Sequence, residues 1–226
     1  SGGTAGRFIS GDTNFENLTF YGSAHTTGTG SVDLYVQGHK VKFGSNIIMD
    51  RYIKNGTLPD FDIYGGWRKP NEQYSVAANT PTIEINSGQF NKIIMGNGMG
   101  TNAVSNLQNT TSNNIMGSSS ASFGGTVTVD YIGKMKQEDI GLIAGGNEIG
   151  TIYSNAIINI KNGNVGKIIG GNYADSSNRP TSWAYPLNTF IGTSTINITG
   201  GQIENIIGAS YGRNVNGTTI KSDAYY

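Results

Sequence analysis

The sequence predicts an all-β fold, and within that class a β-solenoid of stacked coils with long loops on one side. Two observations predict it: a composition rich in turn-forming residues, and a motif that recurs along the chain. The 226 residues include 34 glycines, 12 tyrosines and 8 phenylalanines, and 13% are charged, about half the roughly 25% of an average globular domain. This mixture favours short strands joined by tight turns over helices.

The repeated unit is I-x-I-x-x-G-x-Φ-x-x-I-I, where Φ is apolar. Ungapped copies begin at Ile83, Ile158 and Ile196. The alternation in I-x-I directs both side chains to one face, so each copy opens with a strand buried on one side. The glycine that follows accepts a positive φ and predicts a sharp turn before a second strand. The glycines in this position are Gly88, Gly163 and Gly201. We expect three strands per coil.

A fourth copy is interrupted by an insertion. It begins at Val127-Thr-Val129 and reaches its apolar pair at Leu142-Ile143. Repeats of roughly 20 to 50 residues that cannot bury their apolar faces alone stack into solenoids, and variable spacing between them maps to loops on one side. We therefore expect equivalent aliphatic side chains to stack in buried ladders. One such ladder should contain Ile85, Ile160 and Ile198.

The whole chain, 1–226, is interpreted as a single β-solenoid domain. Regular coils are expected over 81–210. Residues 8–50 contain shorter apolar alternations, such as Val41-Lys-Phe43, and are interpreted as irregular coils. Residues 51–80 contain Pro59 and Pro70 and no clear alternation, so we interpret them as a long insertion.

The tandem units resemble the right-handed parallel β-helix of pectin-lyase-like proteins, particularly the Gly/Asn-rich repeats of bacterial surface proteins and adhesins. The resemblance covers about 80–210 well and 8–50 weakly. It implies a fold and a bias toward glycans and the cell exterior, because members include polysaccharide lyases, glycoside hydrolases, phage tailspikes and non-catalytic adhesins. It implies no single activity.

Charge and composition narrow the classes of partner. Fifteen basic residues balance fifteen acidic ones, so the positive field that nucleic acids and anionic membranes require is absent. The sequence has no run of about 18 apolar residues, which a membrane span would need. It has no cysteine, so neither a disulfide nor a thiolate site is expected. We expect an extracellular, secreted or cell-surface module joined to adjoining domains of a larger surface protein.

One enzymatic alternative follows from the outward positions of the first strands. Glu84, Asp130 and Lys161 converge if their coils are consecutive and Asp130 lies opposite Lys161. Two carboxylates about 5 to 9 Å apart are the arrangement that glycoside hydrolysis needs. The structural alternative is a hydrated sheet face with scattered charges.

Aromatic residues outside the repeat indicate a binding site instead. The candidates are Trp67, Tyr173, Trp183, Tyr185 and Tyr211, all beside Gly, Asn, Pro or Ser. Rings in such loops can stack on sugars, whereas the structural alternative is that they anchor the loops against the solenoid. The most promising pair is Trp183 and Tyr185, which Pro180 and Pro186 bracket.

Two further patterns are weaker. Asp12-Thr-Asn14 and Asp60-Phe-Asp62 have the alternating oxygen ligands of a calcium loop without its distal Glu, so calcium is the one ion considered and no other cofactor is expected. Gly208-Ala-Ser210-Tyr-Gly212 matches a nucleophile elbow, but both histidines precede it and no helix follows. We therefore expect a non-catalytic module that binds a glycan or a host surface, with a polysaccharide-degrading enzyme as the alternative.

Overall fold

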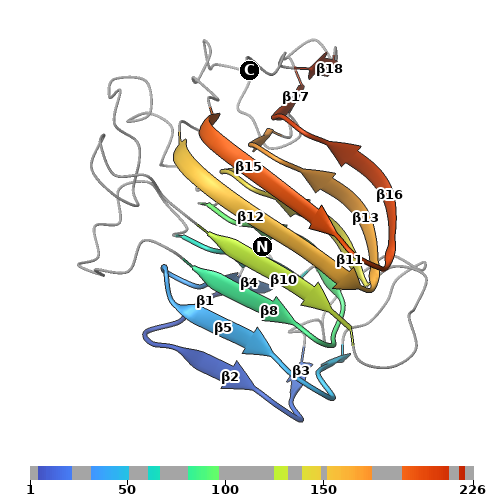
Figure 1. Cartoon of the computed structure of the whole chain (residues 1–226). Helices are drawn as coiled ribbons and strands as arrows, with labels where there is room; N and C mark the ends of the chain where they lie inside the picture. Colours follow the sequence, from blue (N-terminus) through green and yellow to red (C-terminus); the bar gives the residue numbers. More distant parts are fainter. Residues whose placement is uncertain are drawn as a thin grey trace, which may run out of the picture.

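Figure 1 shows the computed structural model of the chain as a stack of parallel strands. The structure describes residues 5–21, 32–50, 61–66, 81–96, 125–131, 139–148, 152–174, 190–213 and 219–221. These residues form strands and turns and no helix, and hence none that could cross a membrane. The expected all-β class and the parallel stacking of coils are confirmed for this part of the chain.

Two large parallel sheets make up most of the stack. The seven-stranded sheet runs in the order β1 (Ala5–Phe8), β4 (Val32–Tyr35), β7 (Phe61–Tyr64), β9 (Phe90–Ile94), β11 (Ile140–Ala144), β13 (Asn164–Ile169) and β16 (Gln202–Ile207). The six-stranded sheet runs in the order β15 (Phe190–Ile198), β12 (Ile152–Asn162), β10 (Thr126–Asp130), β8 (Thr82–Ile85), β5 (Lys40–Phe43) and β2 (Thr13–Phe15). Side chains from both sheets pack into one apolar core.

Short third strands are present at both ends of the stack, so the expected three strands per coil are seen there, whereas the described residues of the coils between them contain two. Near the N-terminus, β3 (Thr19–Tyr21) pairs in parallel with β6 (Ile48–Asp50). Near the C-terminus, β14 (Tyr173–Ala174) pairs in parallel with β17 (Tyr211–Arg213), and β17 pairs antiparallel with β18 (Thr219–Lys221). The first pair follows strands of the six-stranded sheet, whereas β14 and β17 follow strands of the seven-stranded sheet.

The predicted ladder of aliphatic side chains is confirmed. In-register pairing stacks Phe15, Phe43, Ile85, Val129, Ile160 and Ile198 along the six-stranded sheet. Ile85 and Ile160 are fully buried, whereas Ile198 is 42% exposed because it belongs to the last strand of its sheet. The repeat therefore specifies which side chains face the core, and position along the stack specifies how deeply they are buried.

The glycine turns also agree with the prediction. Gly88, Gly163 and Gly201 have φ values of 101°, 115° and 87°, a backbone region that residues with a Cβ rarely adopt. A Cβ on Gly163 would also approach the ring of Tyr131 to 2.5 Å. These turns connect the two large sheets within one coil, from β8 to β9, from β12 to β13 and from β15 to β16.

The interrupted repeat is correct in outline but wrong by one residue. Ile143 and Ala144 pair with Ile93 and Ile94, so they are the apolar pair, and Leu142 lies opposite Lys92 instead. A one-residue slip moves a side chain to the other face of a sheet. The sequence alignment placed Leu142 inside because leucine resembles the repeat more closely than alanine does.

The interpretation of 51–80 as a long insertion needs a correction as well. Phe61–Tyr64 forms β7, which lies between β4 and β9 in the seven-stranded sheet. All four residues of β7 are buried, because Asp62 and Tyr64 on its outward side are covered too. Phe61-Asp62-Ile63 does alternate apolar and polar residues, but the run is short and Pro59 lies just before it, so the pattern alone is weak evidence for a strand.

Candidate functional site

Outward-facing polar side chains form a continuous column on the six-stranded sheet. In-register pairing aligns Asn14, Lys42, Glu84, Thr128, Asn159 and Asn197. The Asn197 amide donates a hydrogen bond to the side-chain oxygen of Asn159 at 2.9 Å. Neighbouring strands are about 4.8 Å apart, so this column presents hydrogen-bonding groups at a regular spacing on a rigid surface.

The three residues of the enzymatic alternative lie on this sheet but not in the expected register. Asp130 pairs with Asn162 rather than Lys161, because a register shift follows Val129. Glu84 and Lys161 are exposed, and Asp130 is half-buried. Glu84 on β8 lies opposite Thr128 on β10, and Asp130 follows Thr128 by two residues. The two carboxylates are therefore diagonal neighbours on adjoining strands, and Lys161 belongs to the next strand, β12.

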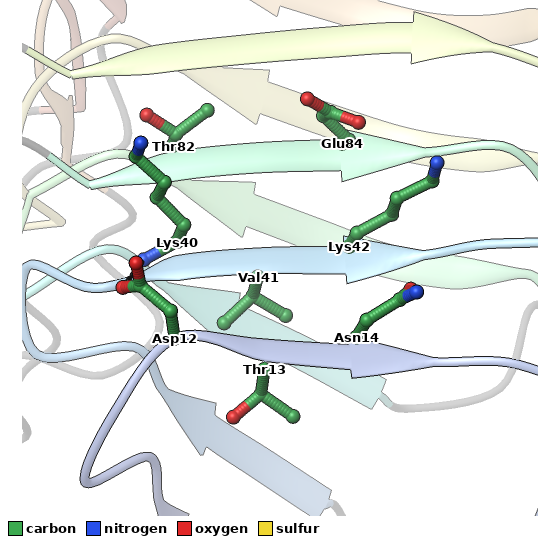
Figure 2. Close-up of a pocket in the computed structure, with 8 residues that line it drawn as sticks. All are labelled: Asp12, Thr13, Asn14, Lys40, Val41, Lys42, Thr82 and Glu84. Carbon is green, nitrogen blue, oxygen red and sulfur yellow. Dashed lines mark hydrogen bonds between the residues drawn. The ribbon is translucent and has the colours of Figure 1, made fainter.

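A shallow depression of about 290 Å³ lies over the N-terminal strands of the same sheet. Figure 2 shows Lys40 and Lys42 leaving β5 on the same side, with Thr82 and Glu84 next to them on β8. Asp12, Thr13, Asn14 and Val41 complete its lining. Of these residues, Glu84 and the Asp12-Thr-Asn14 segment stand out in the sequence, but their convergence with Lys40 and Lys42 was not predicted, because β2 and β5 precede the first regular copy of the repeat.

The depression contains equal numbers of opposite charges. Lys42 and Glu84 are directly opposite each other in the ladder. At its other end, the Asp12 carboxylate accepts the backbone N–H of Lys40 at 2.9 Å and lies 3.8 Å from Nδ1 of His39. The ammonium groups of two lysines and the carboxylates of Asp12 and Glu84, together with the Thr82 hydroxyl and the Asn14 amide, thus line one solvent-accessible space.

The turn after β2 is held by another carboxylate, outside the depression. Glu16 accepts hydrogen bonds from the backbone N–H of Ser45 at 2.7 Å and from its hydroxyl at 3.0 Å. The backbone hydrogen bond is the main reason that the pKa of Glu16 lies below its ordinary value. This carboxylate joins two adjacent coils and is not free to act on a ligand.

A second charged group lies on the outward side of the seven-stranded sheet, and Asp62 is the member of it that stands out in the sequence. We call Asp62, Tyr64, Lys92 and Glu148 the Lys92 cluster. Nζ of Lys92 is 2.8 Å from Oε1 of Glu148 and 3.3 Å from Oδ2 of Asp62. The Tyr64 hydroxyl donates to Glu148 at 3.2 Å, and all four side chains are largely buried.

Electrostatic interactions keep Lys92 ionised between the carboxylates of Asp62 and Glu148. Burial acts to lower the pKa of Lys92, but the carboxylates of Glu148 and Asp62 outweigh it and hold the pKa above its ordinary value. Burial, followed by the charge of Glu148, raises the pKa of Tyr64 well above its ordinary value. Lys92 therefore stays charged and Tyr64 neutral near pH 7, so the cluster attaches the turn at Glu148 to β7 and β9.

The aromatic candidates are only partly within the described residues. Tyr173 and Tyr211 pair in register between β14 and β17, so the two segments expected to lie side by side do so at this point. Tyr173 is half-buried and packs against a second apolar cluster, whose buried members are Tyr35, Tyr64, Ile94, Leu142, Ala144 and Ile169. Trp67, Trp183 and Tyr185 lie outside the described residues, and their proposed role stays a prediction.

Ser210 belongs to a polar ladder rather than to a catalytic elbow. Its hydroxyl oxygen accepts the backbone N–H of Asn172 at 2.9 Å, and the side-chain oxygen of Asn172 accepts the backbone N–H of Asn147 at 2.7 Å. Asn147 and Asn172 are almost fully buried. The recurring Gly-Gly-Asn that follows the apolar pair, at 145–147 and 170–172, is the sequence feature that could have revealed this ladder.

Of the two calcium-like segments, the structure describes Asp12-Thr-Asn14 in full but only the Phe61-Asp62 part of the second. Asp62 is engaged by Lys92 and by the Asn91 amide at 2.8 Å, which leaves its oxygens occupied. Asp12 is engaged by a backbone N–H, and Asp60 lies outside the described residues. Within the described ranges, no three His, Cys, Asp or Glu side chains gather in a group that could hold a metal ion.

Comparisons with protein-family models, with curated proteins and with solved structures found no match to this chain.

Proposed function

We propose that this chain is a non-catalytic, extracellular binding module of a bacterial surface protein, and that it recognises a glycan through the depression at Lys42 and Glu84. The observation that supports this is the depression itself, with its open, charge-balanced set of donors and acceptors on a rigid sheet. A sugar presents hydroxyl groups that both donate and accept hydrogen bonds. Paired carboxylates and ammonium groups satisfy both functions, and charged partners strengthen such bonds.

The charge balance favours a neutral glycan over an acidic one. Two lysines alone would attract carboxylated or sulfated sugars, but Asp12 and Glu84 cancel their field within the same space. Open, polar surfaces of this kind suit recognition at modest affinity, with water between many of the contacts. A binding module of this type needs no moving part, which agrees with a surface built from consecutive strands of one ladder.

The test is a glycan array followed by calorimetric titration of the neutral oligosaccharides that bind. Lys42→Ala and Glu84→Ala should each weaken binding at least tenfold. Asn197→Ala is the matched control, because it alters the same column at the far end of the sheet. Binding that persists in both variants, or that requires acidic sugars, would contradict the proposed site.

The enzymatic alternative rests on the diagonal placement of Glu84 and Asp130. Diagonal neighbours on adjoining strands have Cα atoms about 7 to 8 Å apart, close enough for side-chain rotation to bring the two carboxylates to the separations of about 6.5 to 9.5 Å found in inverting glycosidases. Turnover assays on the same oligosaccharides address it. Product formation that is lost in both Glu84→Gln and Asp130→Asn would replace the binding proposal with a hydrolase.

A further inference from the structure

The C-terminal end of the stack exposes side chains whose ladder partners in the interior of the stack are buried. Ile160 is fully buried, whereas Ile198, its partner in the next strand, is 42% exposed. On the other large sheet, Ile168 is fully buried and its partner Ile206 is 51% exposed. The two ladders therefore end on exposed apolar side chains at the positions that, in the preceding coils, pack against the next coil.

The backbone at this end is exposed in the same way. β15 and β16 are the last strands of their sheets among the described residues, and an edge strand presents a row of unpaired N–H and C=O groups. Natural edges are usually protected by charges, by proline or by very short strands. β15 spans nine residues, FIGTSTINI, with no charge and no proline.

The N-terminal end also exposes an apolar side chain, Phe8, but one of its inward positions carries a charge. Arg7 lies at the register position of the core residue Leu34, and a charge at an inward position is one of the devices that prevent strand addition. The terminal strands β2 and β3 have only three residues each. The contrast between the two ends argues against simple head-to-tail stacking, because Arg7 of one copy would then lie on Ile206 of another.

We infer that the edge formed by β15 and β16 is a docking surface for one further parallel coil with the same repeat chemistry. A separate polypeptide, other than a second copy of this chain, would supply that coil. The structure already contains this interface several times. β12 joins β15 and β13 joins β16 through the parallel ladders that the new coil would continue. The incoming strand would place aliphatic side chains on Ile196 and Ile198, and a positive-φ glycine beside Gly201.

The probe is a synthetic peptide of residues 152–171, which holds the β12–turn–β13 unit of this chain. Titrated with the whole chain and followed by fluorescence anisotropy, it should bind saturably with one peptide per chain. The double variant Ile198→Lys/Ile206→Lys should raise the Kd at least tenfold. Phe8→Lys, at the opposite end and 46% exposed in the native chain, is the matched control and should leave the Kd unchanged.

A second arm changes the peptide, so that the folding of the variants does not decide the result. A peptide with Ile158→Asp and Ile160→Asp should not bind the unaltered chain, because its strand can no longer bury an aliphatic face. Absence of saturable binding by the unaltered peptide, or equal binding of both peptides, would overturn the inference. A concentration-dependent dimer in sedimentation equilibrium, abolished by Ile198→Lys/Ile206→Lys, would overturn the proposed occupant in favour of a second copy of the chain. Glycan binding does not enter either arm, so the outcome is independent of the proposed function.

Discussion

Replacing the same ladder residue at two depths of the stack separates burial from identity. Ile160 and Ile198 are partners in one parallel ladder, occupy the same place in the repeat and have exposed fractions of 0% and 42%. Ile160→Ala removes apolar atoms that are surrounded on every side and leaves a cavity, and such substitutions cost about 2 to 5 kcal/mol. Ile198→Ala leaves no closed cavity and forfeits only part of the transfer free energy, roughly 1 kcal/mol.

Urea unfolding monitored by far-ultraviolet circular dichroism measures both losses. The midpoint and the slope should be fitted for each variant, because stacked repeats can unfold in steps and a changed slope would reveal that. Ile160→Val provides an internal scale, with an expected loss of about 0.5 to 1.5 kcal/mol. Equal losses for Ile160→Ala and Ile198→Ala would refute the reasoning, since they would mean that the end of the stack is as well covered as its interior.

Two further predictions concern charged groups. Lys92→Met should destabilise the chain by about 3 to 5 kcal/mol, because the buried carboxylates of Asp62 and Glu148 lose their counter-ion. Adding Glu148→Gln should restore part of this loss in urea titrations, and a single-variant loss below about 1 kcal/mol would show that the pair behaves like a surface salt bridge. Glu16 has a pKa lowered from 4.5 by its hydrogen bonds to Ser45. Its stabilising contribution should be present above pH 4.5 and be lost as the pH falls through the lower native value, so the stabilities of wild type and Glu16→Gln should converge in acid, whereas a constant difference would contradict the assignment.

The repeat made the core of the fold predictable. The ladder through Ile85 and Ile160 and the positive φ at Gly88 and Gly163 follow from side-chain alternation and glycine chemistry alone. The one-residue error at Leu142 arose where an insertion separates the two strands and the apolar pair is Ile-Ala rather than two large aliphatic residues. The local sequence pattern hardly distinguishes Leu142-Ile143 from Ile143-Ala144 as the apolar pair. Pairing of β11 with β9 in the ladder selects the second.

The strand β7 shows a different limit. Asp62 and Tyr64 are buried on the outward side because they meet Lys92 and Glu148, which come from later coils. The short alternation Phe61-Asp62-Ile63 would at most predict a strand with one face in water, whereas β7 is buried on both faces. A strand of this kind becomes recognisable only when its neighbours in space are known.

The same reasoning explains why the depression escaped prediction while the core did not. The repeat constrains inward positions, since each must match the residue in the next coil, but it leaves outward positions free. Lys40, Lys42 and Asp12 are outward residues of coils that precede the first regular copy, where the inward pattern itself is weak. Their convergence depends on the register of β2 on β5 and of β5 on β8. In a solenoid, chemistry at the surface is therefore assembled between coils, and it becomes visible only when the coils are stacked.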